Sequence, residues 1–456
     1  MIKLKKFLLL ILPVAIIFLL PNLSHATNGY FSHGTSVAEK GLAGAGVAYS
    51  QDTLAAATNP AGMVWQGGGY DIGVALFAPM RSYSVTGGPA LPAGTFCGAM
   101  CPFSIGDGSQ SIDSDNELFL IPQFGYNWQL NSESTIGISV FGNGGMNTEY
   151  KGGTARLNDG FGTLVDLPGT FGAGTAGVDL SQLFISTTYS AQFSEKASWG
   201  ISGILVYQRF KADGLTNFGG FSTDPNNLSN KGDDSSTGVG LRIGVQAEIG
   251  AGWTLGAAYQ PKIDMGEFDK YAGLFAEKGD FDIPSNYTVG VAWNIGNDRV
   301  FVFDIQQINY EDVAAVSNPI KPLTDGSCIP GPTGGTGSGC LGGSAGAGFG
   351  WRDMTVYKLG YEWDSSDAWT WRVGYSKTDQ PIPESEMLFN ILAPGVVEDH
   401  ITFGFTKDLG NDNDFNFAFM YAPSVSVSGT SPFDSTQTIE IEMEQYELAF
   451  SYSKSF

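Results

Sequence analysis

The sequence has 456 residues, a formal net charge of −23 and 63 glycines. A chain this acidic repels nucleic acid, so no nucleic-acid partner is predicted. A soluble chain of this length usually divides into two or three domains, but a membrane barrel escapes that limit because lipid covers its outer face. Aromatic residues make up 13% of the chain and charged residues 15%. This balance is typical of barrel strands and loops rather than of helical enzymes.

The N-terminus has the features of an export signal, and residues 1–26 are predicted to be a cleaved signal peptide. A lysine-rich start precedes an apolar run over residues 7–20, and Ser24-His25-Ala26 fits a small-x-small cleavage site. The run is shorter than the roughly 20 residues that a membrane-spanning helix needs, although an uncleaved anchor helix remains the alternative. Cleavage would remove three lysines and no acids, which leaves 20 basic and 46 acidic side chains.

Large apolar residues alternate with small or polar ones from about Gly69 to the end of the chain. In Ser285–Ile295, for example, Tyr287, Val289 and Trp293 share one face of the segment. A period of two predicts β-strands. A soluble sandwich would also alternate, but its second face would be solvated and charged. Here the second face is rich in Gly, Ala, Ser and Asn, which favours a barrel with lipid outside and a filled lumen inside.

The alternating runs predict an all-β fold, an antiparallel membrane barrel of about fourteen strands over residues 69–456. An even number places both termini in the periplasm. Tight turns such as Asp364–Asp367 alternate with long loops such as Lys321–Gly348, as expected for periplasmic turns and outer loops. The strands are predicted to begin near Gly69, Asn116, Ser134, Asp179, Ala197, Ser235, Gly252, Asp282, Arg299, Gly350, Ala368, Val397, Asp412 and Ile439.

The last strand ends at Phe456, and the alternating residues on its outer face are mostly aromatic. An aromatic terminal strand of this kind resembles the signal read by the barrel-insertion machinery, which is therefore an expected assembly partner. Ile439, Ile441 and Met443 lie on the opposite parity from Tyr446. This change of parity predicts a β-bulge near Glu444-Gln445.

Residues 27–68, between the signal peptide and the first strand, are rich in Gly and Ala and do not alternate. A flexible periplasmic tail is one interpretation. A plug folded inside the lumen is favoured, because small residues allow close packing against the barrel wall.

Four cysteines form two close pairs, Cys97 with Cys101 and Cys328 with Cys340. In an exported protein, an even number at short spacing predicts two disulfide-closed loops. A metal site is the weaker alternative, because after cleavage only His33 and His400 remain and neither lies near a pair. No metal and no cofactor are predicted.

After the signal peptide, the chain runs from Asn28 through a glycine-rich stretch with Gly44 and Gly46 to Asn59-Pro60-Ala61. This segment resembles the hatch of the FadL/TodX family, whose best-known signature is the Asn-Pro-Ala element. Further similar blocks are Asp282–Tyr287 and Trp351–Asp353, so the resemblance covers essentially the whole mature chain. The glycines are not a nucleotide fingerprint, because their spacing is wrong and no βαβ unit surrounds them.

The resemblance implies a monomeric fourteen-stranded barrel in the outer membrane of a Gram-negative bacterium, surrounded by lipid and lipopolysaccharide, with a hatch that blocks the lumen. It implies passive transport of hydrophobic small molecules, first of all long-chain fatty acids, with alkanes or aromatic hydrocarbons as the alternative ligands. The ligand would leave sideways into the membrane. Lateral exit is physically sensible because it spares an apolar chain the cost of hydration, about 0.8 kcal/mol per CH₂.

In the family the lateral gate comes from an inward kink of the third strand. The matching strand contains Gly142-Asn143-Gly144-Gly145. Three glycines in four positions weaken a ladder and supply no side chains to seal the wall. An ordinary glycine bend at a barrel corner is the alternative.

The resemblance also implies basic side chains that bind a fatty acid carboxylate. The matching positions are Arg352 and Arg209. Arginine can bind a carboxylate through two hydrogen bonds. Arg352 shares parity with Lys358 and Glu362 and is expected to face the lumen, whereas Arg209 shares parity with Leu205 and Tyr207, which look lipid-facing.

Two other functions compete with transport of hydrophobic molecules. A membrane-embedded lipase or acyltransferase would need a serine–histidine couple, and only His33 and His400 are available, so no enzyme activity is predicted. A hydrophilic porin or a surface adhesin is the other alternative, but an open porin needs no plug of forty residues.

Overall fold

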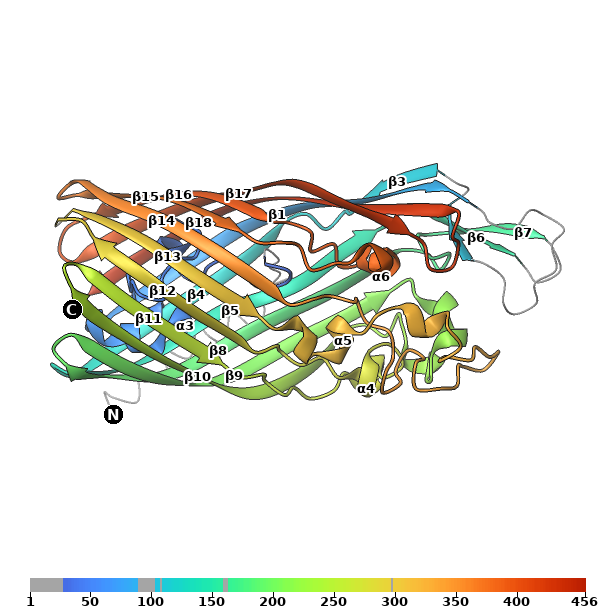
Figure 1. Cartoon of the computed structure of the whole chain (residues 1–456), viewed down its shortest axis with the longest axis horizontal. Helices are drawn as coiled ribbons and strands as arrows, with labels where there is room; N and C mark the ends of the chain where they lie inside the picture. Colours follow the sequence, from blue (N-terminus) through green and yellow to red (C-terminus); the bar gives the residue numbers. More distant parts are fainter. Residues whose placement is uncertain (1–27, 89–102, 107–108, 159–162, 297) are drawn as a thin grey trace, which may run out of the picture.

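The computed structural model describes residues 28–88, 103–106, 109–158, 163–296 and 298–456. Fourteen antiparallel strands form a closed barrel, in which β1 and β18 pair from Gly69–Ser455 to Gly87–Gln437 (Figure 1). The barrel strands are β1 (Gly69–Gly87), β4 (Phe119–Asn131), β5 (Ser134–Tyr150), β8 (Ala176–Ser194), β9 (Ala197–Asp213), β10 (Asp234–Gly250), β11 (Trp253–Gln260), β12 (Asn286–Asn294), β13 (Arg299–Ile308), β14 (Met354–Ser366), β15 (Trp369–Lys377), β16 (Asp399–Asp408), β17 (Asn413–Thr430) and β18 (Gln437–Ser455).

The prediction of an antiparallel barrel of about fourteen strands with an internal plug is confirmed. Every predicted strand start lies within four residues of the observed one, and those at Gly69, Ser134, Ala197 and Arg299 coincide with it. The predicted signal peptide and the Cys97–Cys101 pair lie outside the described residues.

The two faces of the wall alternate residue by residue. On β9, for example, Trp199, Ile201 and Leu205 are exposed, while Gly200 and Ser202 between them are buried. An exposed aliphatic and aromatic face is stable only against lipid, because in water it would form a continuous apolar patch around the molecule.

Paired tryptophans mark the end of the barrel that carries the tight turns. Trp253 stacks on Trp293 with ring centroids 5.1 Å apart, and Trp369 stacks on Trp371 at 5.4 Å. Trp253 and Trp369 open their strands, immediately after tight turns. Aromatic belts of this kind lie at membrane–water interfaces. The C-terminus lies at this end of the barrel, the expected periplasmic side (Figure 1).

The opposite end carries long connections with short helices. None of the helices in the described part of the chain is long and apolar enough to cross a membrane. A disulfide joins Cys328 to Cys340 in the connection between β13 and β14. The helical turns at this end are η3 (Thr216–Phe221), η4 (Pro225–Asn227), η5 (Asp269–Tyr271), α4 (Ala276–Gly279), η6 (Tyr310–Asp312), α5 (Ala314–Ser317), η7 (Lys321–Leu323), η8 (Glu384–Glu386) and α6 (Met387–Asn390).

Four short strands extend the wall beyond the barrel at this end (Figure 1). Strand β3 (Ser109–Asp113) pairs with the outer half of β1. A separate sheet has the order β2-β6-β7, formed by Phe103–Ile105, Thr154–Asn158 and Leu164–Pro168.

The predicted bulge in the last strand is wrong. β18 pairs with β1 without interruption, and its odd-numbered residues face inward from Gln437 to Ser451. The irregularity lies on the partner strand β17, between Ala422 and Val425. Ile439 and Ile441 are apolar because the interior of the barrel is itself apolar in its outer half. In that half, an apolar set of alternating residues therefore does not identify the lipid-facing side of a strand.

Closure of the barrel can be tested by cross-linking. Leu76 on β1 pairs with Leu448 on β18, and both side chains are exposed on the outer face. Directly opposite residues bring their Cβ atoms to disulfide distance. We expect the double variant Leu76→Cys/Leu448→Cys to form an internal disulfide under oxidant, seen as a mobility shift on denaturing gels. Leu76→Cys/Leu359→Cys, whose second cysteine lies on β14, is the control and should not cross-link; a shift in both would contradict the topology.

Candidate functional site

Residues 28–68, which we call the hatch, lie inside the barrel at the end with the tight turns (Figure 1). The hatch contains the short helices α2 (Val37–Lys40), α3 (Ala55–Thr58) and η1 (Pro60–Trp65). Its small residues allow the backbone to approach the wall closely. Hydrogen bonds join it to ten strands: β1, β5, β8, β9, β10, β13, β14, β15, β16 and β18.

The Asn-Pro-Ala element anchors the hatch to the wall. The Asn59 amide donates to the carbonyls of Val47, at 2.6 Å, and Val245 on β10, at 3.1 Å. Its oxygen accepts from the Ala61 amide at 3.0 Å and so caps η1, which Pro60 opens. One asparagine therefore joins two turns of the hatch and one strand.

Wall glycines make room for this element. A Cβ on Gly200 would lie 2.3 Å from the carbonyl carbon of Pro60, and a Cβ on Gly244 would lie 2.0 Å from Oδ1 of Asn59. Any side chain at either position would push the hatch away from the wall. The small residues that the sequence places on the inner face of the strands therefore allow the hatch to pack against the wall.

The glycine-rich turn of the hatch binds a carboxylate of the wall. Gly44 has a φ of +78°, and a Cβ there would lie 1.6 Å from the carbonyl oxygen of His33. The turn that follows directs the amides of Gly46 and Val47 at Oδ2 of Asp304 on β13, at 2.8 and 2.9 Å. Both predicted hatch glycines thus lie at points where the chain needs the space or the backbone freedom.

Two buried ion pairs lie at the hatch–wall interface. Lys40 on α2 contacts Glu447 on β18 at 2.7 Å, and each side chain is only 3% exposed. Arg372 pairs with Glu362 at 2.6 Å within the wall, and Glu362 also accepts from the Tyr49 hydroxyl of the hatch at 2.5 Å. Removing one member of such a pair leaves an uncompensated buried charge, which is costly. Polar contacts can, however, be exchanged for water, which lowers the cost of separating the two surfaces.

A carboxyl pair lies where the hatch meets the start of β1. Thr53 donates to Oδ2 of Asp71 from its amide, at 2.9 Å, and from its hydroxyl, at 2.6 Å. Burial and, after it, the Asp71 carboxylate raise the pKa of the neighbouring Asp52 well above its ordinary value.

The third barrel strand, β5, is interrupted at the predicted kink. The β4–β5 ladder ends at the pair Phe124–Val140, and the β5–β8 register shifts between Gly142 and Gly144. Beyond this point the hatch bonds to β5: Ser32 donates to the carbonyl of Asn143 at 2.9 Å, and the Gly145 amide donates to the carbonyl of Tyr30 at 3.0 Å. A Cβ on Gly144 would lie 1.8 Å from that carbonyl oxygen. The glycines at the kink therefore admit the hatch backbone as a short additional strand.

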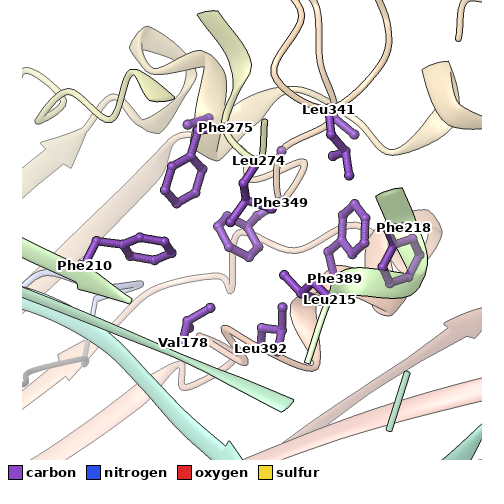
Figure 2. Close-up of a pocket in the computed structure, with 13 residues that line it drawn as sticks. Val178, Phe210, Leu215, Phe218, Leu274, Phe275, Leu341, Phe349, Phe389 and Leu392 are labelled. Atoms are coloured by element: carbon purple, nitrogen blue, oxygen red, sulfur yellow. The ribbon is translucent and has the colours of Figure 1, made fainter. Parts of the chain in front are cut away.

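A small apolar cavity lies among the outer loops (Figure 2). Every side chain around it is a hydrocarbon, and no charged residue lines it. Such a surface favours an uncharged apolar group and offers no hydrogen bond to a polar one. The lining residues are Val178, Phe210, Leu215, Phe218, Leu274, Phe275, Ala315, Leu341, Ala347, Gly348, Phe349, Phe389 and Leu392.

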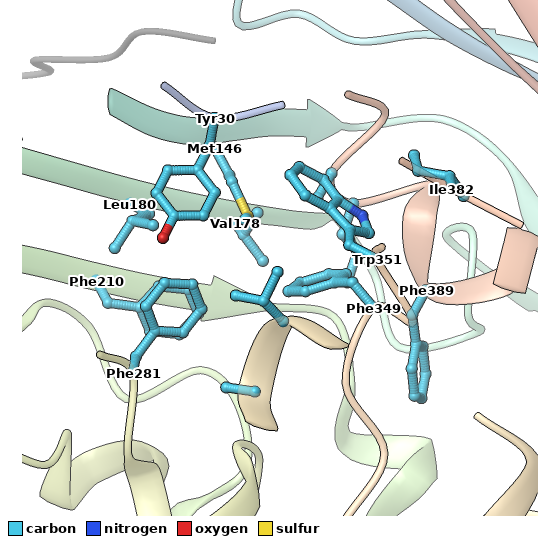
Figure 3. Packing of buried hydrophobic residues seen from close by; sticks show 14 of the residues in the cluster. Tyr30, Met146, Val178, Leu180, Phe210, Phe281, Phe349, Trp351, Ile382 and Phe389 are labelled. Atoms are coloured by element: carbon cyan, nitrogen blue, oxygen red, sulfur yellow. The ribbon is translucent and has the colours of Figure 1, made fainter. Parts of the chain in front are cut away.

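The cavity is continuous with an apolar core that reaches the hatch and the kink (Figure 3). Phe349 of the cavity lies 6.4 Å from Trp351 between ring centroids, and Trp351 lies 6.1 Å from Tyr30 of the hatch. Met146, just beyond the kink, belongs to the same core. The sequence did not reveal this core, because its residues come from loops and strands far apart in the chain.

The two arginines proposed for carboxylate binding do not face the lumen. Arg352 is exposed, since β14 begins only at Met354 and the alternation does not extend back to it, whereas Lys358 and Glu362 do face inward. Arg209 lies on the outer parity of β9 and pairs with Asp179, at 3.4 Å, and Asp233, at 3.7 Å. Neither side chain lines the apolar cavity.

Sequence reasoning missed the buried cations Arg81 and Arg242; these and Lys358, whose inward parity it did give, are each 8% exposed or less. All three lie on the inward parity of their strands. The signal that could have identified them is a basic residue among the small or polar residues that alternate with the large apolar ones.

The two histidines considered for an enzyme lie together in the hatch–wall contact. The rings of His33 and His400 stack with centroids 5.8 Å apart, and Nδ1 of His400 lies 3.0 Å from the hydroxyl oxygen of Ser376. Ser376 and His400 are completely buried, so an ester has no access to the pair.

A lipid-facing barrel, an internal polar hatch and an apolar cavity next to an interrupted strand ladder define a plugged membrane channel. The family model described as outer membrane protein transport protein (OMPP1/FadL/TodX) matches residues 23–456. The chain therefore belongs to this family of outer-membrane transport channels, which is not a family of enzymes. No curated protein sequence matches it.

Solved structures of the same architecture agree. The toluene transporter TodX of Pseudomonas putida is 18% identical with a TM-score of 0.62, over 94% of this chain and 100% of that one. A Pseudomonas aeruginosa FadL homologue is 14% identical with a TM-score of 0.61, over 94% and 100%. The Ralstonia pickettii toluene transporter TbuX is 16% identical with a TM-score of 0.57, over 93% and 99%. At these identities the similarity shows the fold alone.

The fit between hatch and wall can be tested with two glycines of β9. Gly200→Val places a side chain against Pro60, while Gly203→Val meets nothing within 4 Å. We expect Gly200→Val to displace the hatch and to raise the steady conductance in planar bilayers severalfold, and Gly203→Val to leave it unchanged. Heat-modifiable gel migration checks that both barrels fold. Equal conductance of the two folded variants would show that the hatch does not depend on this contact.

Proposed function

We propose that the protein transports hydrophobic small molecules passively across the outer membrane. The observation that carries this proposal is the apolar cavity, whose lining contains no charged group and whose core continues to the kink. A ligand would enter among the outer loops, replace water around its apolar part with hydrocarbon side chains, and gain about 25 cal/mol per Å² of buried apolar surface.

The next step in this proposal is a movement of the hatch. Tyr30, Phe31 and Ser32 occupy the place where β5 lacks its partner strand. A separate, mostly polar cavity borders Phe31, Ser32 and the kink residues Gly142 and Asn143, and in this proposal the hatch residues withdraw toward it.

The ligand would then leave sideways, through the interrupted wall between β4 and β5. The ladder between these strands stops at Val140, so the backbone offers no further interstrand bonds to break there. A hydrophilic porin would instead need a water-filled lumen, and the hatch occupies that space.

Filling the cavity should block transport. Ala347 lines the cavity and is buried, whereas Ala345 lies in the same connection, is exposed and does not line it. We expect Ala347→Phe to reduce uptake of labelled dodecanoate and toluene by cells expressing the protein at least fivefold, and Ala345→Phe to leave uptake unchanged. Uptake unaffected by Ala347→Phe would exclude the cavity from the route.

Deleting Asn143 should test lateral exit separately. The deletion removes the residue at which the β5–β8 register shifts, so β5 can continue straight and pair further with β4. We expect uptake to fall to background while the purified variant still binds the ligand, measured by calorimetry in detergent. Normal uptake through the straightened wall would contradict exit at the kink.

A further inference from the structure

A line of three amide side chains, Asn143, Gln182 and Gln208, crosses the inner wall from the kink, and we call it the amide chain. Asn143 on β5 donates to Oε1 of Gln182 on β8 at 3.2 Å, and Gln182 donates to Oε1 of Gln208 on β9 at 3.2 Å. Nε2 of Gln208 donates to Oγ of Ser236 on β10 and to the carbonyl of Phe281, each at 2.9 Å. The amide chain therefore links the kink to the connection between β11 and β12.

The acceptor at the far end of the amide chain fixes the orientation of all three amides. The carbonyl of Phe281 can only accept, so Gln208 must turn its NH₂ group toward it and its oxygen toward Gln182. Gln182 must then direct its NH₂ group at Gln208 and its oxygen at Asn143. Every donor of the chain therefore points away from the kink, and turning any one amide over would break bonds on both of its sides.

The amide chain is a polar line through an apolar surface. Gln182 and Gln208 are 1% and 0% exposed. On the inner face, residues of the apolar core precede and follow both of them along their strands: Leu180 and Phe184 on β8, and Val206 and Phe210 on β9. An amide buried among hydrocarbon is unfavourable unless its polar groups are bonded, whereas a fully bonded network specifies one arrangement of the side chains. The glutamines therefore contribute a fixed geometry rather than better packing.

The residue held by the amide chain is the extra residue of the kink. The β5–β8 register skips Asn143, and the β4–β5 ladder has already ended at Val140. The carbonyl of Asn143 accepts instead from the amide of Ser32 in the hatch, at 2.9 Å. A bulged residue has no ladder bonds to fix its direction. The bond to Gln182 supplies that direction, because it keeps the Asn143 side chain on the β8 side of the strand, away from the interrupted side that faces β4.

The other end of the amide chain reaches the wall of the apolar cavity. The ring centroid of Phe281 lies 4.9 Å from that of Phe275, which lines the cavity, and 6.2 Å from that of Tyr30 in the hatch. Figure 3 shows Phe281 and Tyr30 at the same side of the apolar core. The kink is therefore anchored, through the two glutamines, to a segment that packs on both the cavity and the hatch.

We propose that Gln182 and Gln208 are positioning residues of the lateral exit, which hold Asn143 against β8 and so keep the opening between β4 and β5 clear. This inference rests on the proposed transport function. Without the amide chain, the Asn143 amide loses its partner within the core and turns into the polar cavity that it lines beside the kink. In that position it obstructs the exit and draws its own carbonyl away from Ser32.

Methionine substitutions test the proposal, because they keep the length of the side chain and remove its hydrogen bonds. We expect Gln182→Met to lower the uptake of labelled toluene by cells expressing the protein at least fivefold. The purified full-length variant should still bind toluene with wild-type affinity, measured by calorimetry in detergent. Gln208→Met should cause a smaller loss of uptake, because Gln182 can still accept from Asn143.

Hydrogen–deuterium exchange on the same purified proteins locates the effect. Peptides that contain the amides of Ser32 and Gly145, which join the hatch to the kink, should exchange faster in Gln182→Met than in the wild type. Peptides that contain Gly46 and Val47, which bond to Asp304 elsewhere in the hatch, should exchange at the wild-type rate. A general loss of stability would instead raise exchange in both regions.

Ser236→Ala is the matched control, because it removes the side branch of Gln208 and leaves the bonds from Asn143 to Phe281 in place. It should match the wild type in uptake, binding and exchange. The double variant Gln182→Met/Gln208→Met should lose no more uptake than Gln182→Met alone, because Asn143 has already lost its partner in the single variant.

Three results would overturn the proposal: unchanged uptake in a folded Gln182→Met, an equal loss of uptake and toluene binding, or faster exchange throughout the hatch. Heat-modifiable gel migration shows that the barrels fold, and Gln208→Met carries the same comparison if Gln182→Met does not fold. If cells expressing the wild type take up no toluene, the transport proposal fails, while the exchange measurement still tests whether the glutamines hold Asn143.

Discussion

The structure depends on one constraint: inside a bilayer, every backbone N–H and C=O group must find a partner within the protein. Closing β1 onto β18 meets that requirement around the barrel. One interruption lies at β5, whose ladder to β4 stops at Val140. There the hatch supplies partners for the unpaired backbone, through the carbonyl of Tyr30 and the amide of Ser32. The plug and the interrupted wall are therefore parts of one arrangement, in which the same backbone groups close the lumen and complete the strand.

The interior is divided in a way that follows from the same arrangement. Around the hatch it is polar, with ion pairs and carboxylate-to-amide contacts such as Lys40–Glu447 and Asp304 with Gly46. Beyond the hatch it is hydrocarbon, and inward residues of β18 such as Ile439 and Met443 join that core. A polar interface allows the plug to exchange contacts with water, and an apolar chamber suits the hydrophobic ligand that we propose. The amide chain crosses the hydrocarbon core next to the kink.

The strands could be predicted from the sequence because lipid imposes a residue-by-residue signal. Alternation in segments such as Ser285–Ile295 located strand starts to within four residues, and turns marked the periplasmic end. The kink and the hatch were predicted from glycines and from the Asn59-Pro60-Ala61 element, and both lie where backbones touch. The two arginines suggested for carboxylate binding could not be placed in this way. Arg352 lies just outside its strand, where alternation no longer indicates which side a residue faces. Arg209 lies on the outer face of its strand.

By itself, the sequence determined the barrel, its approximate strand boundaries, the position of the plug and the family, because each of these depends on local pattern or on contiguous motif. Only the tertiary structure decided which amides meet beside the kink, where the apolar core runs, and which strand carries the irregularity opposite Glu444. Those features arise where segments hundreds of residues apart meet, as Tyr30 meets Trp351. The free energy of a buried charge or cavity depends on all the groups around it, and no local pattern records them.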